Sequence, residues 1–195
     1  MSLLLETIKI DNGEIFNLRY HQQRCDNSRK ILFQSTRQLT LSSIIHPPPK
    51  GLYKCRILYT DTLYSIEYIP YREKEIYRLK IVPSSISYAF KYANRSALKK
   101  LQLNAPGYDD IIIEKDGYLT DTSIANLAFF DGRQWFTPKN PLLKGTMRQK
   151  LLDEGFLSTA MIKSTELKRY THVALMNAMI GFKILKYIHP KEIKV

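Results

Sequence analysis

The sequence predicts an α+β protein of two units, and three observations support this fold class. Strand-like and helix-like segments both recur along the 195 residues, without an internal repeat or a low-complexity tract. Two Asp-Gly steps, at 116–117 and 131–132, are strong signals for hairpin turns. A connection over residues 83–90 separates two groups of elements. We therefore expect an N-terminal α+β domain over residues 1–83 and a β-rich C-terminal domain over 84–195.

The first domain is expected to combine strands with two helices. Its opening segment alternates apolar and polar residues, turns at "DNG" and returns as a second strand. The second helix stops at "HPPPKG", because proline lacks an N–H donor and cannot continue a helix. Later strands are rich in Tyr, Ile and Val, as strands usually are. The expected strands are 4–10, 14–18, 52–60, 63–71 and 75–82, and the expected helices are 20–33 and 36–45.

The second domain is expected to contain more strand than helix. A helix is expected over residues 93–103, where apolar residues recur at helical spacing. A second helix is expected to begin near Thr146 and to stop at Gly155. The expected strands are 108–115, the two hairpins within 116–138, and then 157–163, 172–177 and 181–188.

Composition narrows the class of protein. Thirty Lys and Arg against eighteen Asp and Glu give a net charge of +12, which favours an anionic partner. The basic residues are dispersed, as on a solvated surface, so the charge does not choose among nucleic acid, membrane surface and small anion. No segment approaches the ~20 apolar residues of a membrane helix. Two scattered cysteines and a start without a basic leader region predict reduced thiols in a cytoplasmic protein.

Several familiar sites are absent from the sequence. There is no Gly-rich phosphate loop and no G-x-S-x-G motif. The four histidines are dispersed and do not show metal-ligand spacing with the cysteines, so we expect no metal.

Two residues are candidates for covalent or electrostatic chemistry. Lys91 lies in "FKYANR" between aromatic residues, where a half-buried amine can lose its charge and become a nucleophile; the alternative is an ordinary surface lysine. Asp121 lies in "TDTSIAN", a segment that interrupts the strands of the second domain. It could provide a fixed anion beneath a cofactor, or it could hold the loop as an Asx-turn.

Three further places could bind a phosphate. Gly145 and Thr146 begin a helix, whose amides and dipole favour an anion, although Thr is also an ordinary helix cap. Arg24 could grip a phosphate with two N–H groups or could lie in solvent. Asn177 with Ala178, at the end of "HVALMN", is a weaker candidate. Together, a reactive lysine, an anion for a ring nitrogen and a phosphate site are what pyridoxal phosphate requires.

The order of these motifs resembles the fold-type IV pyridoxal-phosphate family, which contains class IV aminotransferases and aminodeoxychorismate lyases. The resemblance runs through the segments "ETIKIDNGEIFNLRYHQQRCDNS", "FKYANRSALKKL", "DDIIIEKDGYLTDTSIANLAFFDG", "FTP", "LLKGTMRQKLL" and "ALMNAMIGF". It implies a two-domain fold with an abbreviated N-terminal domain, and a homodimer with the site between the domains. The start lacks an earlier segment usual in the family, and residues 43–88 form a shortened region.

The resemblance also implies roles for individual residues. Lys91 would bond covalently to the cofactor, and Asp121 would face the pyridine nitrogen where the family usually has Glu. The residues implied to bind the phosphate are Arg24, Gly145, Thr146, Asn177 and Ala178. Asn126 would be structural. "TDTSIAN" would then interrupt the sheet because it passes under the cofactor ring.

Within the family, "FKYANR", "GTMRQ" and "MNAM" are similar to the lyase versions of these motifs. The resemblance therefore implies a 4-amino-4-deoxychorismate lyase, which releases pyruvate and 4-aminobenzoate for folate synthesis from a small anionic amine. Candidate partners for the substrate carboxylates are Arg95, Lys54, Arg56 and Lys80. The alternatives are a class IV aminotransferase, a family member that binds cofactor without turnover, and a basic nucleic-acid-binding protein that stacks bases on its thirteen tyrosines.

Overall fold

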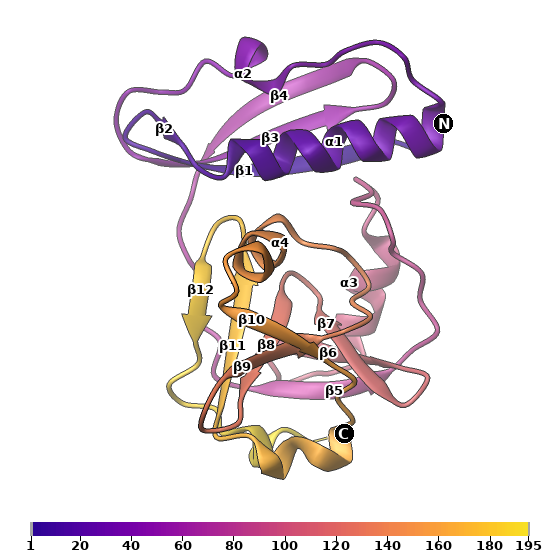
Figure 1. The fold of residues 1–195 in the computed structure, drawn as a ribbon, viewed down its shortest axis with the longest axis vertical. Helices are drawn as coiled ribbons and strands as arrows, with labels where there is room; N and C mark the ends of the chain where they lie inside the picture. Colours follow the sequence, from indigo (N-terminus) through magenta and orange to yellow (C-terminus); the bar gives the residue numbers. More distant parts are fainter. Residues whose placement is uncertain (1, 195) are drawn as a thin grey trace. The chain divides into compact units, whose positions relative to one another are not determined.

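A computed structural model of the chain describes residues 2–194. The chain divides into two compact units, drawn in Figure 1. Unit 1 comprises Met1–Glu73 and Phe90–Asn94, and unit 2 comprises Lys74–Ala89 and Arg95–Val195. The expected α+β class with two units is confirmed.

Unit 1 is an antiparallel sheet of four strands in the order β2-β1-β3-β4, with helix α1 along it (Figure 1). Its core is formed by the inner faces of β1 and β3 and by the apolar side of α1. The elements are β1 (Leu4–Asp11), β2 (Glu14–Ile15), α1 (Leu18–Phe33), α2 (Leu41–Ile44), β3 (Leu52–Tyr59) and β4 (Leu63–Pro70). Leu4, Ile8 and Ile10 are fully buried on one face of β1, as the alternation of the sequence predicts.

Unit 2 is a branched sheet with the order β10-β9-β8-β7-β6-β5, in which β11 pairs with both β8 and β12. Pairs β5–β6 and β9–β10 are parallel, and the other pairs are antiparallel. The strands are β5 (Leu79–Pro83), β6 (Asp110–Lys115), β7 (Tyr118–Thr122), β8 (Asn126–Phe130), β9 (Trp135–Pro138), β10 (Leu157–Ala160), β11 (His172–Asn177) and β12 (Gly181–Ile184). The helices are α3 (Ser96–Leu103), α4 (Thr146–Asp153) and two short 3₁₀ segments, η1 (Ser164–Arg169) and η2 (Pro190–Glu192).

Both Asp-Gly hairpins are confirmed. Asp116 and Gly117 join β6 to β7 with positive φ angles of 51° and 79°, which the two central residues of a type I′ turn require. The second turn, between β8 and β9, is an Asx-turn, because Asp131 Oδ1 accepts the N–H groups of Arg133 and Gln134.

The boundary between the units differs from the expected one at residue 83. Strand β5 pairs in parallel with β6 and therefore belongs to unit 2. The segment Phe90–Asn94 belongs to unit 1, because Leu4 and Tyr92 form a β-bridge. The helix expected over 36–45 shortens to one turn, α2.

Between residues 2 and 194 there is no helix both long and apolar enough to cross a membrane.

Candidate functional site

In unit 1, a carboxylate occupies a core position of strand β1. Glu6 lies in the inward-facing row with Leu4 and Ile8 and is completely buried. An isolated buried carboxylate is costly, so it requires partners of opposite charge or hydrogen-bond donors. Helix α1 supplies them from His21 and Arg24, which are three residues apart and therefore lie on one face of the helix.

The three side chains form a compact network. Arg24 donates its Nε–H to Glu6 Oε1 (2.8 Å) and an Nη2–H to Glu6 Oε2 (2.6 Å). His21 Nδ1 lies 2.6 Å from Oε2. Burial alone would raise the pKa of Glu6, but Arg24 and His21 hold it at about 2. The carboxylate is therefore ionised and can only accept, so His21 Nδ1 carries the hydrogen of this bond.

Lys91 lies in a segment that is bonded to the start of β1. The Leu5 N–H donates to the Lys91 carbonyl (2.9 Å), and the Ala93 N–H donates to the Leu3 carbonyl (2.9 Å). The pKa of His21 is lowered, mainly by burial and further by the charges of Arg24 and Lys91. Lys91 and Arg24, both predicted from the sequence as cofactor-binding residues, therefore lie in unit 1, and the charge of each lowers the pKa of His21.

In unit 2, Asp121 is a buried carboxylate near the end of β7. The Leu143 N–H donates to its Oδ2 (2.8 Å), and Asn126 Nδ2 donates to its Oδ1 (2.7 Å). Burial raises the pKa of Asp121 to about 7, although these donors and the charge of Arg148 act in the opposite direction. A buried carboxyl group with a raised pKa is a favourable neighbour for a cation, because a positive charge would stabilise its ionised form.

Asn126 connects this carboxylate to the start of helix α4. Its Nδ2 also donates to the Leu143 carbonyl (2.8 Å). A Cβ atom on Gly145 would lie only 2.0 Å from Asn126 Oδ1, so this position requires glycine for close approach rather than for backbone freedom. Gly145 has no side chain to cap the helix, and Thr146 at its first position is buried. The Asn126 side chain therefore joins the Asp121 carboxylate to the start of α4 at Gly145 and Thr146.

Asn177 is the last residue of β11, immediately before the turn that leads to β12. Its Oδ1 accepts the N–H groups of Met179 (2.8 Å) and Ile180 (3.0 Å), and its Nδ2 donates to the Ile124 carbonyl (3.3 Å). The side chain therefore shapes its own turn and links it to the loop that follows Asp121. Ala178 lies within the same turn.

Two of the basic residues considered for substrate binding have partners within the protein. Arg95 donates to the Ser123 carbonyl (2.5 Å), and Arg56 pairs with Glu67 across β3 and β4. Lys80 lies over the ring of Tyr108 at 6.0 Å. These contacts do not select a substrate-binding residue.

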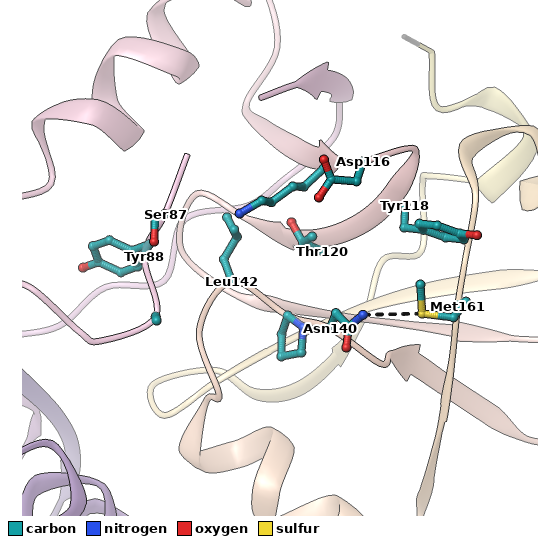
Figure 2. A pocket seen from close by; sticks show the side chains of 11 residues that line it. Ser87, Tyr88, Asp116, Tyr118, Thr120, Asn140, Leu142 and Met161 are labelled. Atoms are coloured by element: carbon teal, nitrogen blue, oxygen red, sulfur yellow. Dashed lines mark hydrogen bonds between the residues drawn. The ribbon is translucent and has the colours of Figure 1, made fainter. Parts of the chain in front are cut away.

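A half-open pocket of about 400 Å³ in unit 2 is shown in Figure 2. It includes Thr120 and Leu142, the chain neighbours of Asp121 and Leu143. Because successive side chains of a strand point to opposite faces, Thr120 and the Asp121 carboxylate lie on opposite faces of β7. None of the residues predicted for the cofactor lines this pocket, so it is separate from the Asp121 site.

Sequence reasoning missed Glu6 and His21, which hold Arg24, and Leu143, whose amide binds Asp121. An acid in the apolar row of a strand was the available signal for Glu6. No sequence signal marks Leu143, because only its backbone takes part.

Residues 3–186 match the model of the family described as amino-transferase class IV. This match spans most of the chain, so the protein belongs to that family. The expected fold-type IV architecture is confirmed by the solved structures that share it.

Individual relatives carry more specific descriptions. A crystal structure from Haemophilus somnus 129PT, described as a "putative 4-amino-4-deoxychorismate lyase", is 35% identical with a TM-score of 0.86, covering 93% of this chain and 98% of that chain. A Schizosaccharomyces pombe protein named "Putative aminodeoxychorismate lyase" is 28% identical over 202 residues, covering 91% of this chain and 86% of that protein. A hypothetical aminotransferase from Mycobacterium tuberculosis in a PLP-bound form has a TM-score of 0.78 at 14% identity, covering 94% of this chain and 80% of that chain, which shows the shared fold alone.

Proposed function

We propose that the protein is a pyridoxal-phosphate enzyme that cleaves 4-amino-4-deoxychorismate into pyruvate and 4-aminobenzoate, a precursor of folate. The observation that carries the cofactor assignment is the buried Asp121 carboxylate, which has amide donors on both oxygens and Asn126 linking it to the start of α4. The donor set fits the group: an acid with a raised pKa is matched by a protonated pyridine nitrogen, and a helix start is matched by a phosphate.

The residues have separate roles in this proposal. Lys91 would hold the cofactor covalently through Nζ, and Asp121 would keep the pyridine nitrogen protonated. Thr146 and the first turn of α4 would bind the phosphate together with Arg24, whose guanidinium is oriented by Glu6. The bound cofactor supplies an electron sink for the carbon that carries the substrate amine.

The chain's own acid-base chemistry would centre on Lys91. Once the substrate amine has taken its place, the Lys91 amine would accept the proton from the carbon that bears the substrate nitrogen. A base must be unprotonated to do this. Loss of the enolpyruvyl group then makes the ring aromatic, so the reaction proceeds in one direction.

The lyase is preferred over an aminotransferase on the basis of its relatives. The Haemophilus somnus structure and the Schizosaccharomyces pombe protein are both described as putative forms of this lyase. The match to the Haemophilus somnus structure covers 98% of that chain. The "FKYANR" segment, from Phe90 to Arg95, supports the same choice through its resemblance to the lyase pattern.

Two assays on the same cofactor-loaded preparation test the substrate. We expect pyruvate and 4-aminobenzoate to appear in equal amounts from 4-amino-4-deoxychorismate, and no transfer of an amino group from branched-chain or D-amino acids to 2-oxoglutarate. Amino-group transfer without pyruvate release would replace the lyase by an aminotransferase. Lys91→Ala should abolish either activity, whereas Lys99→Ala, an exposed lysine on α3, should leave it unchanged.

We also propose a homodimer, in line with the family resemblance. Analytical ultracentrifugation of the loaded protein should give twice the 22.8 kDa mass of one chain, and a monomer at micromolar concentration would contradict it.

A further inference from the structure

The turn that follows Asp121 is compact and uses its own polar groups. Thr122 Oγ1 accepts the N–H groups of Ile124 (3.2 Å) and Ala125 (3.0 Å), and the Thr122 N–H donates to the Ala125 carbonyl (2.8 Å). Asp121 and Asn126 flank this turn and are direct partners in the β7–β8 pairing. Whatever fixes the turn therefore also fixes the distance between the Asp121 carboxylate and its Asn126 donor.

Ser123, at the tip of the turn, is held by a cationic side chain from outside the turn. Arg95, the N-cap residue of α3, donates Nη2–H to the Ser123 carbonyl at 2.5 Å. Asp110, the first residue of β6, is 1% exposed and accepts the Ile111 N–H at 2.9 Å. Burial raises the pKa of Asp110, while the hydroxyls of Ser123 and Thr122 and the amides of Ile111 and Ser123 act to lower it.

The backbone of Ser123, rather than its side chain, carries this interaction. Ser123 Oγ and Asp110 Oδ2 are both buried, and neither completes a hydrogen bond, although the hydroxyl lies near enough to influence the carboxyl. A hydroxyl that makes no bond cannot fix the turn. The cationic donor on the carbonyl of Ser123 can, because bonds to charged groups are stronger than bonds between neutral ones.

We propose that Arg95 is a positioning residue that holds the Asp121 carboxylate in place by binding the carbonyl of Ser123 at the tip of the turn. Its importance for catalysis rests on the proposed function, which requires Asp121 to face the cofactor ring. Arg95 is thereby assigned to the turn and not to a substrate carboxylate.

The experiment follows the ionisation of Asp121 in the cofactor-free protein by carboxyl ¹³C NMR, with the signal assigned by its loss in Asp121→Asn. Burial is the largest influence on this carboxyl group, so a released turn that admits water should lower its pKa. We expect Arg95→Ala to lower it by about one unit or more, a tenfold change in proton affinity. Arg95→Lys keeps one cationic donor, so the Asp121 pKa should fall less in this variant than in Arg95→Ala.

Two controls make the outcome decisive. Ser123→Ala keeps both peptide groups, and Lys99→Ala lies on α3 in solvent, so both should leave the Asp121 titration unchanged. An unchanged titration in Arg95→Ala would overturn the proposal, and so would a Ser123→Ala shift as large as that of Arg95→Ala. If Arg95→Ala does not fold, Arg95→Lys decides: its single donor replaces the arginine fork only in part, so the Asp121 pKa should still fall, and an unaltered titration would refute the role. The titration needs no cofactor, so a protein that fails to bind pyridoxal phosphate would remove the proposed function without deciding this inference.

Discussion

Gly145→Ala provides a direct test of the contact between Asn126 and the start of α4. The backbone of Gly145, at φ −71° and ψ 147°, is one that alanine adopts readily. Backbone preference alone predicts a slight stabilisation of about 0.4–1 kcal/mol, because alanine has less freedom in the unfolded chain. The added Cβ, however, would lie 2.0 Å from Asn126 Oδ1, so the amide must move.

The cost follows from the bonds that Asn126 would lose. Its bond to the Asp121 carboxyl is worth about 1.5–3 kcal/mol and its bond to the Leu143 carbonyl about 1 kcal/mol. After subtraction of the backbone gain, we expect Gly145→Ala to lower the free energy of unfolding by about 2–3 kcal/mol. Urea unfolding of the cofactor-free protein, followed by circular dichroism, measures this value.

A matched glycine and a double mutant separate the two causes. Gly107 has φ +82° and open space around its Cβ position, so Gly107→Ala should cost about 1–2 kcal/mol from backbone strain alone. In an Asn126→Ala background, Gly145→Ala should become nearly neutral, which gives a coupling of about 2 kcal/mol. A smaller loss for Gly145→Ala than for Gly107→Ala, or additive effects with Asn126→Ala, would refute the close contact.

Three further predictions concern buried ionisable groups. Arg24→Met should destabilise the protein by about 3 kcal/mol or more at pH 7, because it leaves the buried Glu6 anion without its strongest partner. Glu6 has a lowered pKa of about 2, so its stabilising effect is present above pH 4.5 and is lost as the pH falls towards 2. If Arg24→Met lowered the free energy of unfolding by the same amount at pH 7 and at pH 3, this assignment would be contradicted. Burial raises the pKa of Asp121 to about 7 from its ordinary value of 3.8, so the free energy of unfolding of the cofactor-free protein should fall by up to about 4 kcal/mol between pH 4 and pH 7.5. Asp121→Asn should lack this fall in urea titrations. Cys25 and Cys55 are buried, with pKa values raised to about 12 mainly by burial, so a thiol reagent at pH 8 should label them at least about 100-fold more slowly in the native protein than in urea.

Sequence patterns predicted the elements whose signals are local. The alternation of residues 4–10 predicted β1, and the Asp-Gly steps predicted both hairpins, because turn chemistry is set by adjacent residues. The helix that begins at Thr146 was predicted by its flanking glycines. The 3₁₀ segment over Ser164–Arg169 was missed, because its short i to i+3 pattern leaves no amphipathic period.

The site was predictable only where side chains carry the chemistry. Lys91, Asp121 and Gly145 stand out by residue type and position, and Asp121 and Gly145 lie in one constellation of unit 2. The Glu6 network depends on the register of β1 against α1, which pairs residues fifteen and eighteen positions apart. The contact between Arg95 and Ser123 joins residues twenty-eight positions apart through a peptide group, and peptide groups are the same at every position of a sequence.

The central claim is that the amine of Lys91 carries pyridoxal phosphate. Borohydride reduction of the cofactor-loaded protein, followed by peptide mass spectrometry, tests it most directly, since reduction makes the linkage to the lysine permanent. We expect one pyridoxyl-phosphate group per chain, located on Lys91, and no modification in Lys91→Ala treated in the same way. A reduced group on a different lysine, or a protein that remains unmodified after reconstitution, would contradict the assignment.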